Sequence, residues 1–312
     1  MPGIAVLTNP RSRQNRRDPR LAGQLAYMLG TKGEVAQPHT LPELVEAARR
    51  FREAGVDVVA INGGDGTAHV VLTAFVKAYG DDALPPIALL RGGTMNTIAS
   101  GMGIRGTPGA LLEKLIVRYH TGEPFPTTDR YLMKVGGEDP QYGFLFGNGL
   151  IANFLEAYYE GSEPSPTKAA ILLGRAICSA VINGELIRKV MRPVEVEVDV
   201  DGERWMAQSY LTVAAGTVDD IGLGFRPFFE SVRHPGRMHA VGMACTPLGV
   251  VAALPSIWMA KTPSNPDILQ AIPQRLVMRS ERAINYMVDG DFHQGGQSLE
   301  VTMGPRVRFV LG

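Results

Sequence analysis

Apolar and polar residues switch between strand-like and helix-like spacing along the first 126 residues. Short apolar runs predict strands at residues 4–7, 34–37, 56–61 and 86–90. Apolar residues at helical spacing predict helices at residues 19–29, 41–54, 67–79 and 94–100. The run 56–61 is rich in β-branched residues, as in a strand buried in the centre of a sheet. This alternation predicts an α/β domain with a parallel sheet.

The spacing changes after Pro124-Phe125-Pro126, and short strand-like runs dominate the remaining chain. They lie at residues 131–135, 142–147, 194–200, 205–214, 275–280, 284–288, 298–303 and 307–311. Helical insertions interrupt them at residues 151–159 and 168–191, and Asp201-Gly202 predicts a hairpin turn. We therefore predict two domains. Residues 1–126 form the α/β domain, and residues 127–312 form a mainly β, sandwich-like domain.

The composition is that of a globular protein, with 45% hydrophobic and 20% charged residues among 312. The formal net charge is zero, which gives no general attraction to nucleic acid, and we expect no nucleic-acid partner. Cys178 and Cys245 are too few for a disulfide framework, and a reducing cytoplasm suits them. No basic segment precedes the apolar residues 4–7, so we expect no signal peptide.

The longest run without a charged residue covers 240–260, which is long enough to be weighed as a membrane span. Gly242, Pro247, Gly249 and Pro255 interrupt this run. Because glycine and proline weaken a helix, we expect no transmembrane helix here.

A glycine-rich turn, Gly63-Gly64-Asp65-Gly66-Thr67, follows the predicted central strand. Glycine lets backbone N–H groups approach an anion closely, so the turn suits a phosphate group. Thr67 is placed to cap the following helix, whose positive end would face the same anion. A carboxylate would repel phosphate there unless it serves a metal ion or takes a proton. Asp65 is therefore a candidate Mg²⁺-linked group or general base, and a tight turn with Asp65 bonded to the backbone is the structural alternative.

A second glycine run, Gly92-Gly93-Thr94-Met95-Asn96, follows the next strand and opens the next helix. Thr94 can cap that helix and donate its hydroxyl, and Asn96 can bridge backbone and phosphate. An ordinary helix cap is the structural alternative for this run. Two such turns on neighbouring strands are more specific for phosphate than either turn alone.

A third polar segment, Thr8-Asn9-Pro10-Arg11-Ser12, follows the first strand. Asn9 and Ser12 can hydrogen-bond phosphate oxygens. Open α/β sheets bind ligands at the carboxyl ends of their strands, so we expect all three segments at one edge. The chain has neither a P-loop nor the protein-kinase signature motifs.

In this order and spacing, Asn9-Pro10-x-Ser12, Gly63-Gly64-Asp65-Gly66-Thr67 and Gly93-Thr94-x-Asn96-x-x-Ala99 resemble the diacylglycerol kinase catalytic domain. That family includes bacterial soluble lipid kinases, sphingosine kinases and ceramide kinases. The resemblance implies a nucleotide domain related to phosphofructokinase and NAD kinase, a β-rich C-terminal domain, and an active cleft between them. It implies ATP and Mg²⁺ as cofactors. The cofactor-binding residues that it implies are Asn9, Pro10, Ser12, Gly63, Gly64, Gly66, Thr67, Gly93, Thr94 and Asn96.

Two segments of the second domain extend the resemblance. Gly147-Asn148-Gly149 resembles an asparagine-containing segment of the family, and Met287-Val288-Asp289-Gly290-Asp291 resembles its late Asp-Gly-Glu motif. The likeness implies Asp289 as a second catalytic residue beside Asp65, with either of them able to meet the metal. It places Asp291 near the nucleotide, where Glu is usual. From the residues alone, Val-Asp-Gly-Asp predicts a hairpin turn.

The chain also departs from the family pattern. Arg13, Arg91 and Thr97 stand where Gly, Pro and Asp are usual, and His69 stands where Glu is usual. We expect His69 at the exposed start of its helix. These changes leave the ATP-facing residues in place and leave the choice of lipid open.

The resemblance therefore implies an ATP-dependent lipid kinase that phosphorylates the hydroxyl of diacylglycerol, ceramide or a sphingoid base by in-line transfer. It implies a cytoplasmic enzyme peripherally associated with the membrane, with its lipid substrate at the membrane surface, and leaves a homodimer open. Two alternatives stay open. One is a kinase of a soluble substrate, as in NAD kinase. The other is a catalytically silent nucleotide- or lipid-binding protein.

The lipid side of this function has weaker signals in the sequence. Apolar runs at 171–173 and 250–259 can line a cleft for acyl chains, lie on a membrane, or form core. Basic residues between 168 and 192 can attract anionic headgroups or keep a helix in solution.

Overall fold

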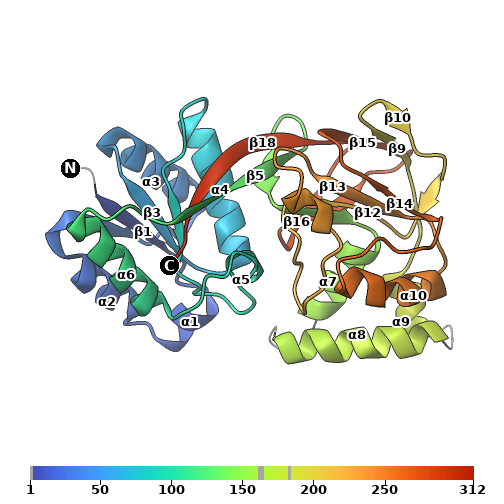
Figure 1. Cartoon of the computed structure of the whole chain (residues 1–312), viewed down its shortest axis with the longest axis horizontal. Coiled ribbons are helices and arrows are strands. Elements are labelled where there is room, and N and C mark those ends of the chain that lie inside the picture. Colours follow the sequence, from blue (N-terminus) through green and yellow to red (C-terminus); the bar gives the residue numbers. More distant parts are fainter. Residues whose placement is uncertain (1–2, 161–164, 182–183) are drawn as a thin grey trace. The chain divides into compact units, whose positions relative to one another are not determined.

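The computed structural model describes residues 3–160, 165–181 and 184–312 (Figure 1). Its contacts divide the chain into two compact units, which we describe separately. Unit 1 comprises Met1–Arg130 and Pro305–Gly312, and unit 2 comprises Tyr131–Gly304. The sequence-based division at residue 126 assigns the last residues of the chain to the second domain. In the structure these residues return to the first unit, because they pair with its sheet.

The sheet of unit 1 is parallel. Its strands are β1 (Ile4–Thr8), β2 (Gly33–Ala36), β3 (Val58–Asn62), β4 (Ile87–Leu89) and the end of β18 (Ser298–Val310). They lie in the order β18-β4-β3-β1-β2, and every pair is parallel. All residues of β1, β3 and β4 are buried, as their apolar runs predict. The predicted α/β fold class with a parallel sheet is confirmed.

Helices connect these strands, and caps fix several of their ends. They are α1 (Arg13–Arg17), α2 (Leu21–Leu29), α3 (Leu41–Ala54), α4 (Asp65–Tyr79), α5 (Thr97–Gly101) and α6 (Pro108–Thr121), with a 3-10 turn at Gly30–Lys32. Thr40 and Thr107 accept backbone hydrogen bonds at the starts of α3 and α6. Gly55 and Gly122 end the same two helices in the left-handed conformation. The sequence analysis missed α1 and α6.

Unit 2 is built mainly from antiparallel strands. They are the second part of β5 (Thr127–Val135), β6 (Gln141–Gly143), β7 (Leu145–Asn148), β8 (Val194–Glu195), β9 (Glu197–Val200), β10 (Glu203–Arg204), β11 (Ser209–Tyr210), β12 (Thr212–Gly216), β13 (His239–Met243), β14 (Ile268–Ala271), β15 (Arg275–Arg279), β16 (Asn285–Val288), β17 (Asp291–Gln294) and the first part of β18. One sheet has the order β14-β13-β12-β7-β16-β17. Another contains β10-β9-β15-β18, with β5 paired to β18 and β6.

Apolar residues of both sheets form one core, as in a sandwich. Val198, Leu276 and Val301 of one sheet share a cluster with Val213 and Tyr286 of the other. This confirms the sandwich-like prediction. The runs predicted as separate strands at 298–303 and 307–311 form one strand, β18, because it continues from unit 2 into unit 1.

Helices cover one sheet of unit 2 through a second core cluster. They are α7 (Leu150–Tyr159), α8 (Pro166–Val181), α9 (Glu185–Val190) and α10 (Pro247–Trp258), and a 3-10 turn lies at Phe229–Val232. The charge-free run 240–260 divides into β13 and α10, which the sequence analysis did not separate. Within the described ranges, no helix is both long and apolar enough to cross a membrane.

Candidate active site

Three loops meet at the carboxyl edge of the unit 1 sheet. They follow β1, β3 and β4, which are adjacent strands. The Asn9 amide donates to the Asn62 carbonyl at 3.1 Å, and the Leu90 amide donates to the Ile61 carbonyl at 2.9 Å. The Gln14 amide reaches the Gly92 carbonyl at 3.1 Å. These bonds connect the loop after β1 and the loop after β4 to the loop after β3 and to each other. The segments predicted to form one phosphate site therefore lie together.

The glycines of the two runs let the second and third loops touch through their backbones. A Cβ on Gly93 would collide with the Cα of Gly64, and a Cβ on Gly64 would lie 3.0 Å from the Cα of Gly93. A Cβ on Gly63 would collide with the Thr67 side chain. Glycine is required at these positions because a side chain would clash with neighbouring atoms, and not because the backbone has a positive φ. Gly66 lies in the first turn of α4.

Replacing Gly93 by alanine is expected to lower the free energy of unfolding by about 2–3 kcal/mol, because the new methyl group meets backbone that cannot move aside. Urea unfolding measures this change. Gly109→Ala is the matched control, since Gly109 lies in α6 of the same unit with open space around it. Equal unfolding free energies for the two variants would contradict the close approach.

The Asp65 side chain joins the two glycine loops. Its Oδ2 accepts from the Thr97 amide at 2.9 Å and its Oδ1 accepts from the Ile98 amide at 3.1 Å. It therefore holds the first turn of α5 from outside that helix. Burial raises the pKa of Asp65, and the hydrogen bonds from Thr97 and Ile98 act in the opposite direction. The Thr97 side chain and the backbone of Asp65 itself also hydrogen-bond this carboxylate and lower its pKa.

The predicted threonine caps are wrong. The cap of α4 is Gly64, and Thr67 lies inside the helix, where its hydroxyl accepts from Asn9 Nδ2 at 2.7 Å. The cap of α5 is Asn96, two residues after Thr94. Helix α4 begins earlier and α5 begins later than the sequence suggests, so neither threonine stands at a helix boundary. Both side chains are partly exposed beside the glycine runs.

Asn96 shapes its own loop. It has φ 51°, its Oδ1 accepts from the Gly93 amide at 3.0 Å, and its Nδ2 donates to the Gly93 and Arg91 carbonyls at 3.1 and 3.3 Å. These bonds hold the loop from within, and the contact of Asn96 with a phosphate stays a prediction. Arg91 donates to Ser100 Oγ at 2.9 Å and to the Ile104 carbonyl at 2.5 Å, and so braces the end of α5.

A buried asparagine network lies behind the first loop. Asn15 Nδ2 donates to the Asn9 carbonyl at 2.6 Å and to Ser12 Oγ at 2.8 Å. Asn62 Nδ2 donates to Asn15 Oδ1 at 2.9 Å. The sequence analysis missed Asn15 and Asn62, although Asn62 directly precedes the first glycine run. Pro10 is partly buried between Asn9 and Arg11, whose amide donates to Asn9 Oδ1 at 2.9 Å.

His69 does not lie on the surface. It is only 1% exposed, which corrects the expectation of an exposed position at the start of α4. The helix begins at Asp65, so residue 69 falls on the face that packs into unit 1. His69 is a core residue of α4.

Asp289 belongs to unit 2, where it forms a two-residue hairpin turn with Gly290. Their φ values are 48° and 95°, and the turn joins β16 to β17. Asp289 Oδ1 accepts from the Phe144 and Leu145 amides at 3.0 and 2.8 Å, and Oδ2 lies 3.1 Å from the Phe144 amide. The side chain is 6% exposed. Asn148 is also a core residue, and its Oδ1 accepts from the Val213 amide at 2.7 Å.

Asp291 begins β17, and burial raises its pKa from 3.8 to about 6. A carboxyl group with a raised pKa favours folding below its unfolded pKa, and that contribution is lost as the pH rises through the folded pKa. Asp291→Asn is therefore expected to be more stable than the native protein at pH 8, by at most about 3 kcal/mol. The advantage should vanish near pH 4 in urea unfolding. A difference that does not depend on pH would contradict the raised pKa.

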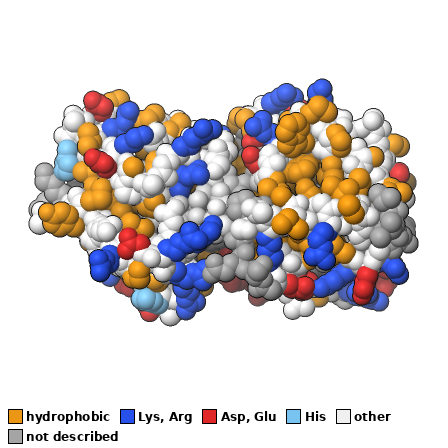
Figure 2. Space-filling model, turned by 90° about the horizontal axis from the view of Figure 1, so that it is seen from below, with side chains coloured by type: hydrophobic (Ala, Val, Ile, Leu, Met, Phe, Trp, Pro, Cys, Tyr) orange, Lys and Arg blue, Asp and Glu red, His pale blue; other side chains and the backbone are white. Residues whose placement is uncertain are grey.

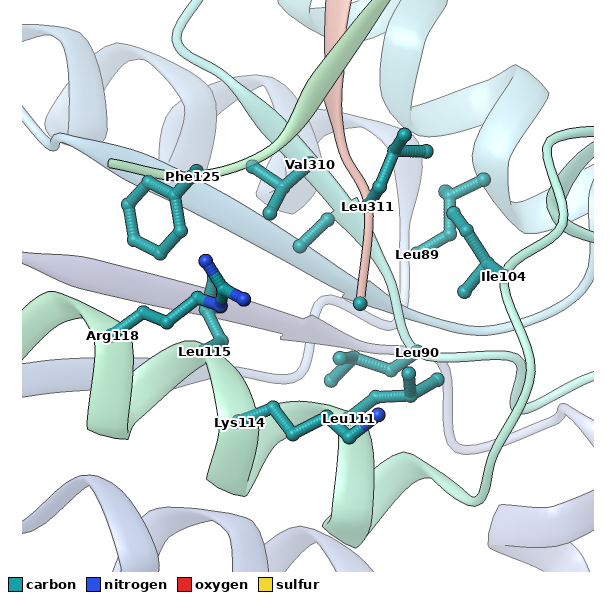
Figure 3. Close-up of a pocket in the computed structure, with 12 residues that line it drawn as sticks. Leu89, Leu90, Ile104, Leu111, Lys114, Leu115, Arg118, Phe125, Val310 and Leu311 are labelled. Carbon is teal, nitrogen blue, oxygen red and sulfur yellow. The ribbon is translucent and has the colours of Figure 1, made fainter. Parts of the chain in front are cut away.

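A small hollow lies elsewhere in unit 1 (Figure 3). Aliphatic side chains of Leu89, Leu111 and Leu311 line it, with Lys114 and Arg118 on the α6 side. None of the predicted site residues lines this hollow. The three loops, and not this hollow, carry the chemistry that the sequence predicts.

The described residues contain no group of three or more His, Cys, Asp or Glu side chains that could hold a metal ion. A cage made from protein alone is therefore not available in this part of the chain. Mg²⁺ in phosphoryl-transfer sites commonly binds one or two carboxylates together with substrate phosphates and water. Asp65 supplies one carboxylate beside the glycine loops, which fits a site that binds Mg²⁺ together with phosphates and water.

Comparisons with known proteins show the family. The family described as the diacylglycerol kinase catalytic domain matches residues 3–122. Lipid kinase YegS of Escherichia coli strain K12 is 45% identical over 274 residues, which cover 88% of this chain and 81% of YegS. The fold, the glycine loops and this match define a kinase.

Solved structures share the fold. A diacylglycerol kinase from Bacillus anthracis str. Sterne superposes with a TM-score of 0.66 at 14% identity, over 99% of this chain and 97% of that one. A second structure from that organism gives a TM-score of 0.70 at 16% identity, over 99% and 95% of the two chains. The chain belongs to the lipid kinase family that carries the diacylglycerol kinase catalytic domain. The resemblance seen in the sequence is confirmed.

Proposed function

We propose that the protein transfers the γ-phosphoryl group of ATP to the hydroxyl of a membrane lipid. Diacylglycerol is the first candidate, followed by ceramide and sphingoid bases. The observation that carries the proposal is the Asp65 carboxylate, held by the Thr97 and Ile98 amides where the glycine loops meet. A fixed carboxylate next to phosphate-binding loops is what transfer to a hydroxyl requires.

In the proposed mechanism the glycine loops bind the phosphates of ATP, because their backbones leave room for close approach. Thr67 and Thr94 offer hydroxyl groups to phosphate oxygens. Asp65 accepts the proton of the lipid hydroxyl as its oxygen attacks the γ-phosphorus in line and ADP departs. Mg²⁺, when bound by Asp65 and the phosphates, would neutralise the charge that develops on the transferred group.

The raised pKa of Asp65 suits this role. Burial favours the neutral carboxyl group, so the carboxylate holds a proton more readily than an exposed aspartate does. Both carboxylates accept from backbone amides, but Asp65 is partly exposed between the glycine loops, whereas Asp289 is only 6% exposed in unit 2. We therefore propose Asp65 as the base, and Asp289 as a residue that shapes the start of β7.

A radiolabelled-ATP assay tests the function. The protein would be incubated with diacylglycerol, monoacylglycerol, ceramide, sphingosine and phosphatidylglycerol in detergent micelles, and the products separated by lipid chromatography. Label in one lipid, with ADP formed only when that lipid is present, is the expected result. Phosphorylation of NAD without lipid would favour a soluble substrate, and tight ATP binding without turnover would favour a silent binding protein.

A further inference from the structure

The outer face of α10 is apolar along its whole length. Leu248 is 55% exposed, Trp258 is 60% exposed, and Met259 at the C-cap is 49% exposed. Ala252 and Pro255 lie between them at helical spacing and are exposed too. The helix contains no charged residue. Its opposite face already packs in the core through Val250, Ala253 and Ile257, so the outer face is apolar surface beyond what folding uses.

The neighbouring helix α8 extends this surface. Helices α8 and α10 are in contact, and Ile171 of α8 is 59% exposed. Ala170 and Gly174 lie on the same exposed side, while Ala176 and Ala180 face the core. Figure 2 shows hydrophobic side chains gathered over this part of unit 2, with Lys and Arg among and around them. Contiguous apolar surface of this kind marks a binding surface.

The charged residues on α8 and just after α10 are all basic, while the exposed Glu160 lies beside Lys168 at the edge of this surface. Helix α8 carries Lys168 and Arg175 and no acidic residue, and Lys261 follows α10 closely. Arg175 and Lys261 are exposed, and neither forms an ion pair with any residue that the structure describes. In a symmetric dimer formed through this surface, the cations of one copy would face the cations of the other and repel them. Anionic lipid headgroups complement them.

We infer that the outer faces of α8 and α10 dock the protein on an anionic lipid bilayer. Trp258 and Met259 enter the interface, where tryptophan is favoured, and Arg175 and Lys261 meet the headgroups. The inference rests on the proposed function, because a substrate held in a bilayer is what gives docking its use. The outer faces of α8 and α10 are then the part of unit 2 that meets that bilayer.

The first test uses the full chain, without ATP, and vesicles of phosphatidylcholine with and without phosphatidylglycerol. Lipids brominated on their acyl chains should quench Trp258, and the quenching should be stronger with phosphatidylglycerol. Trp258→Phe should remove most of the quenching, since the remaining Trp205 packs against Tyr210 and Gly242. Absence of quenching in the native protein would overturn the inference.

The second test compares matched variants by vesicle sedimentation. Met259→Glu should weaken binding by about tenfold or more, because burial of the methionine is lost and a charge is added. Met206→Glu is the control, since Met206 is 90% exposed in the same unit and outside this surface. Arg175→Gln should weaken binding only to vesicles with phosphatidylglycerol. Equal vesicle binding of Met259→Glu and Met206→Glu would overturn the docking surface. A native protein that is dimeric without lipid, and that becomes monomeric in Met259→Glu, would overturn it too.

Kinase assays separate this inference from the proposed function. Met259→Glu should retain activity on lipid in detergent micelles and lose activity on the same lipid in vesicles. Lack of activity of the native protein in micelles, with normal vesicle binding, would refute the kinase function and leave the docking surface standing. Equal activity of Met259→Glu and Met206→Glu on vesicles would refute the docking surface alone.

Discussion

Asparagine in place of Asp65 is expected to reduce kcat for lipid phosphorylation by roughly 10²–10⁴-fold, the usual contribution of a general base. The amide side chain cannot take the hydroxyl proton. It also presents an NH₂ group to the Thr97 or Ile98 amide, where the carboxylate presents two acceptors. The native kcat should rise with pH as the Asp65 carboxyl group loses its proton, since the base acts deprotonated. The variant should lack this rise.

The loss of a base must be separated from misplacement of α5. Asp65→Ser supplies a hydroxyl that can accept from the α5 amides but is not a base. We expect this variant to be more stable than Asp65→Asn and equally inactive. Asp57→Asn is the matched control, because Asp57 is a carboxylate of the same unit that accepts from the Tyr119 hydroxyl at 2.7 Å in an exposed position. Substantial activity in Asp65→Ser would remove Asp65 from the proton-transfer step.

The fold of unit 1 was predictable because its signals are local. A buried strand such as β3 needs only a short apolar run, and α3 carries its own Thr40 cap and Gly55 stop. Helix α1 was missed because Arg13–Arg17 has no apolar period of its own. Its first turn is held instead by contacts with distant residues, among them the bond from Gln14 to Gly92.

The residues of the candidate site were predictable from the sequence, but the hydrogen bonds that connect them were not. The glycine runs and Asp65 stand out in the sequence, yet the bonds from Asp65 to Thr97 and Ile98 join residues more than thirty positions apart. No local pattern shows that Asp65, and not Thr94, supports the start of α5. The same holds for His69, whose burial depends on where α4 begins and on what packs against it.

In unit 2, amino-acid composition alone did not distinguish a strand from a helix. The run 240–260 has no charged residue, and its apolar residues alone do not separate the strand β13 from the helix α10. Thr246 caps α10 and Pro247 stands in its first turn, so the start of the helix had a local signal that the sequence analysis missed. The strand is defined by pairing with β12 and β14, which are distant in sequence. The Asp289-Gly290 turn, by contrast, was predictable from two residues, and its φ values are those that an Asp-Gly hairpin requires.

Asparagine in place of Asp289 is expected to lower the free energy of unfolding by about 3 kcal/mol. The carboxylate is 6% exposed and accepts from the Phe144 and Leu145 amides, and no water can replace it there. An asparagine keeps the positive φ of the turn but offers one acceptor oxygen and one NH₂ group. If the asparagine oxygen takes the place of Oδ1, which accepts from both amides, the NH₂ group takes the place of Oδ2 and meets the Phe144 N–H donor to donor. If the oxygen takes the place of Oδ2, the Leu145 amide loses its partner. Urea unfolding measures the total effect.

Asp201→Asn is a close control for this prediction. Asp201 occupies the same position in another Asp-Gly hairpin, has φ 51°, and accepts from the Gln274 and Arg275 amides at 3.1 and 2.9 Å, but it is exposed. Water can replace its bonds, so we expect Asp201→Asn to cost less than about 1 kcal/mol. Hydrogen exchange should speed up at Phe144 and Leu145 in Asp289→Asn and stay unchanged in β1 and β3. Native stability with a large loss of kcat would instead assign Asp289 to the chemical step, because a carboxylate that only supports β7 cannot be removed without loosening it.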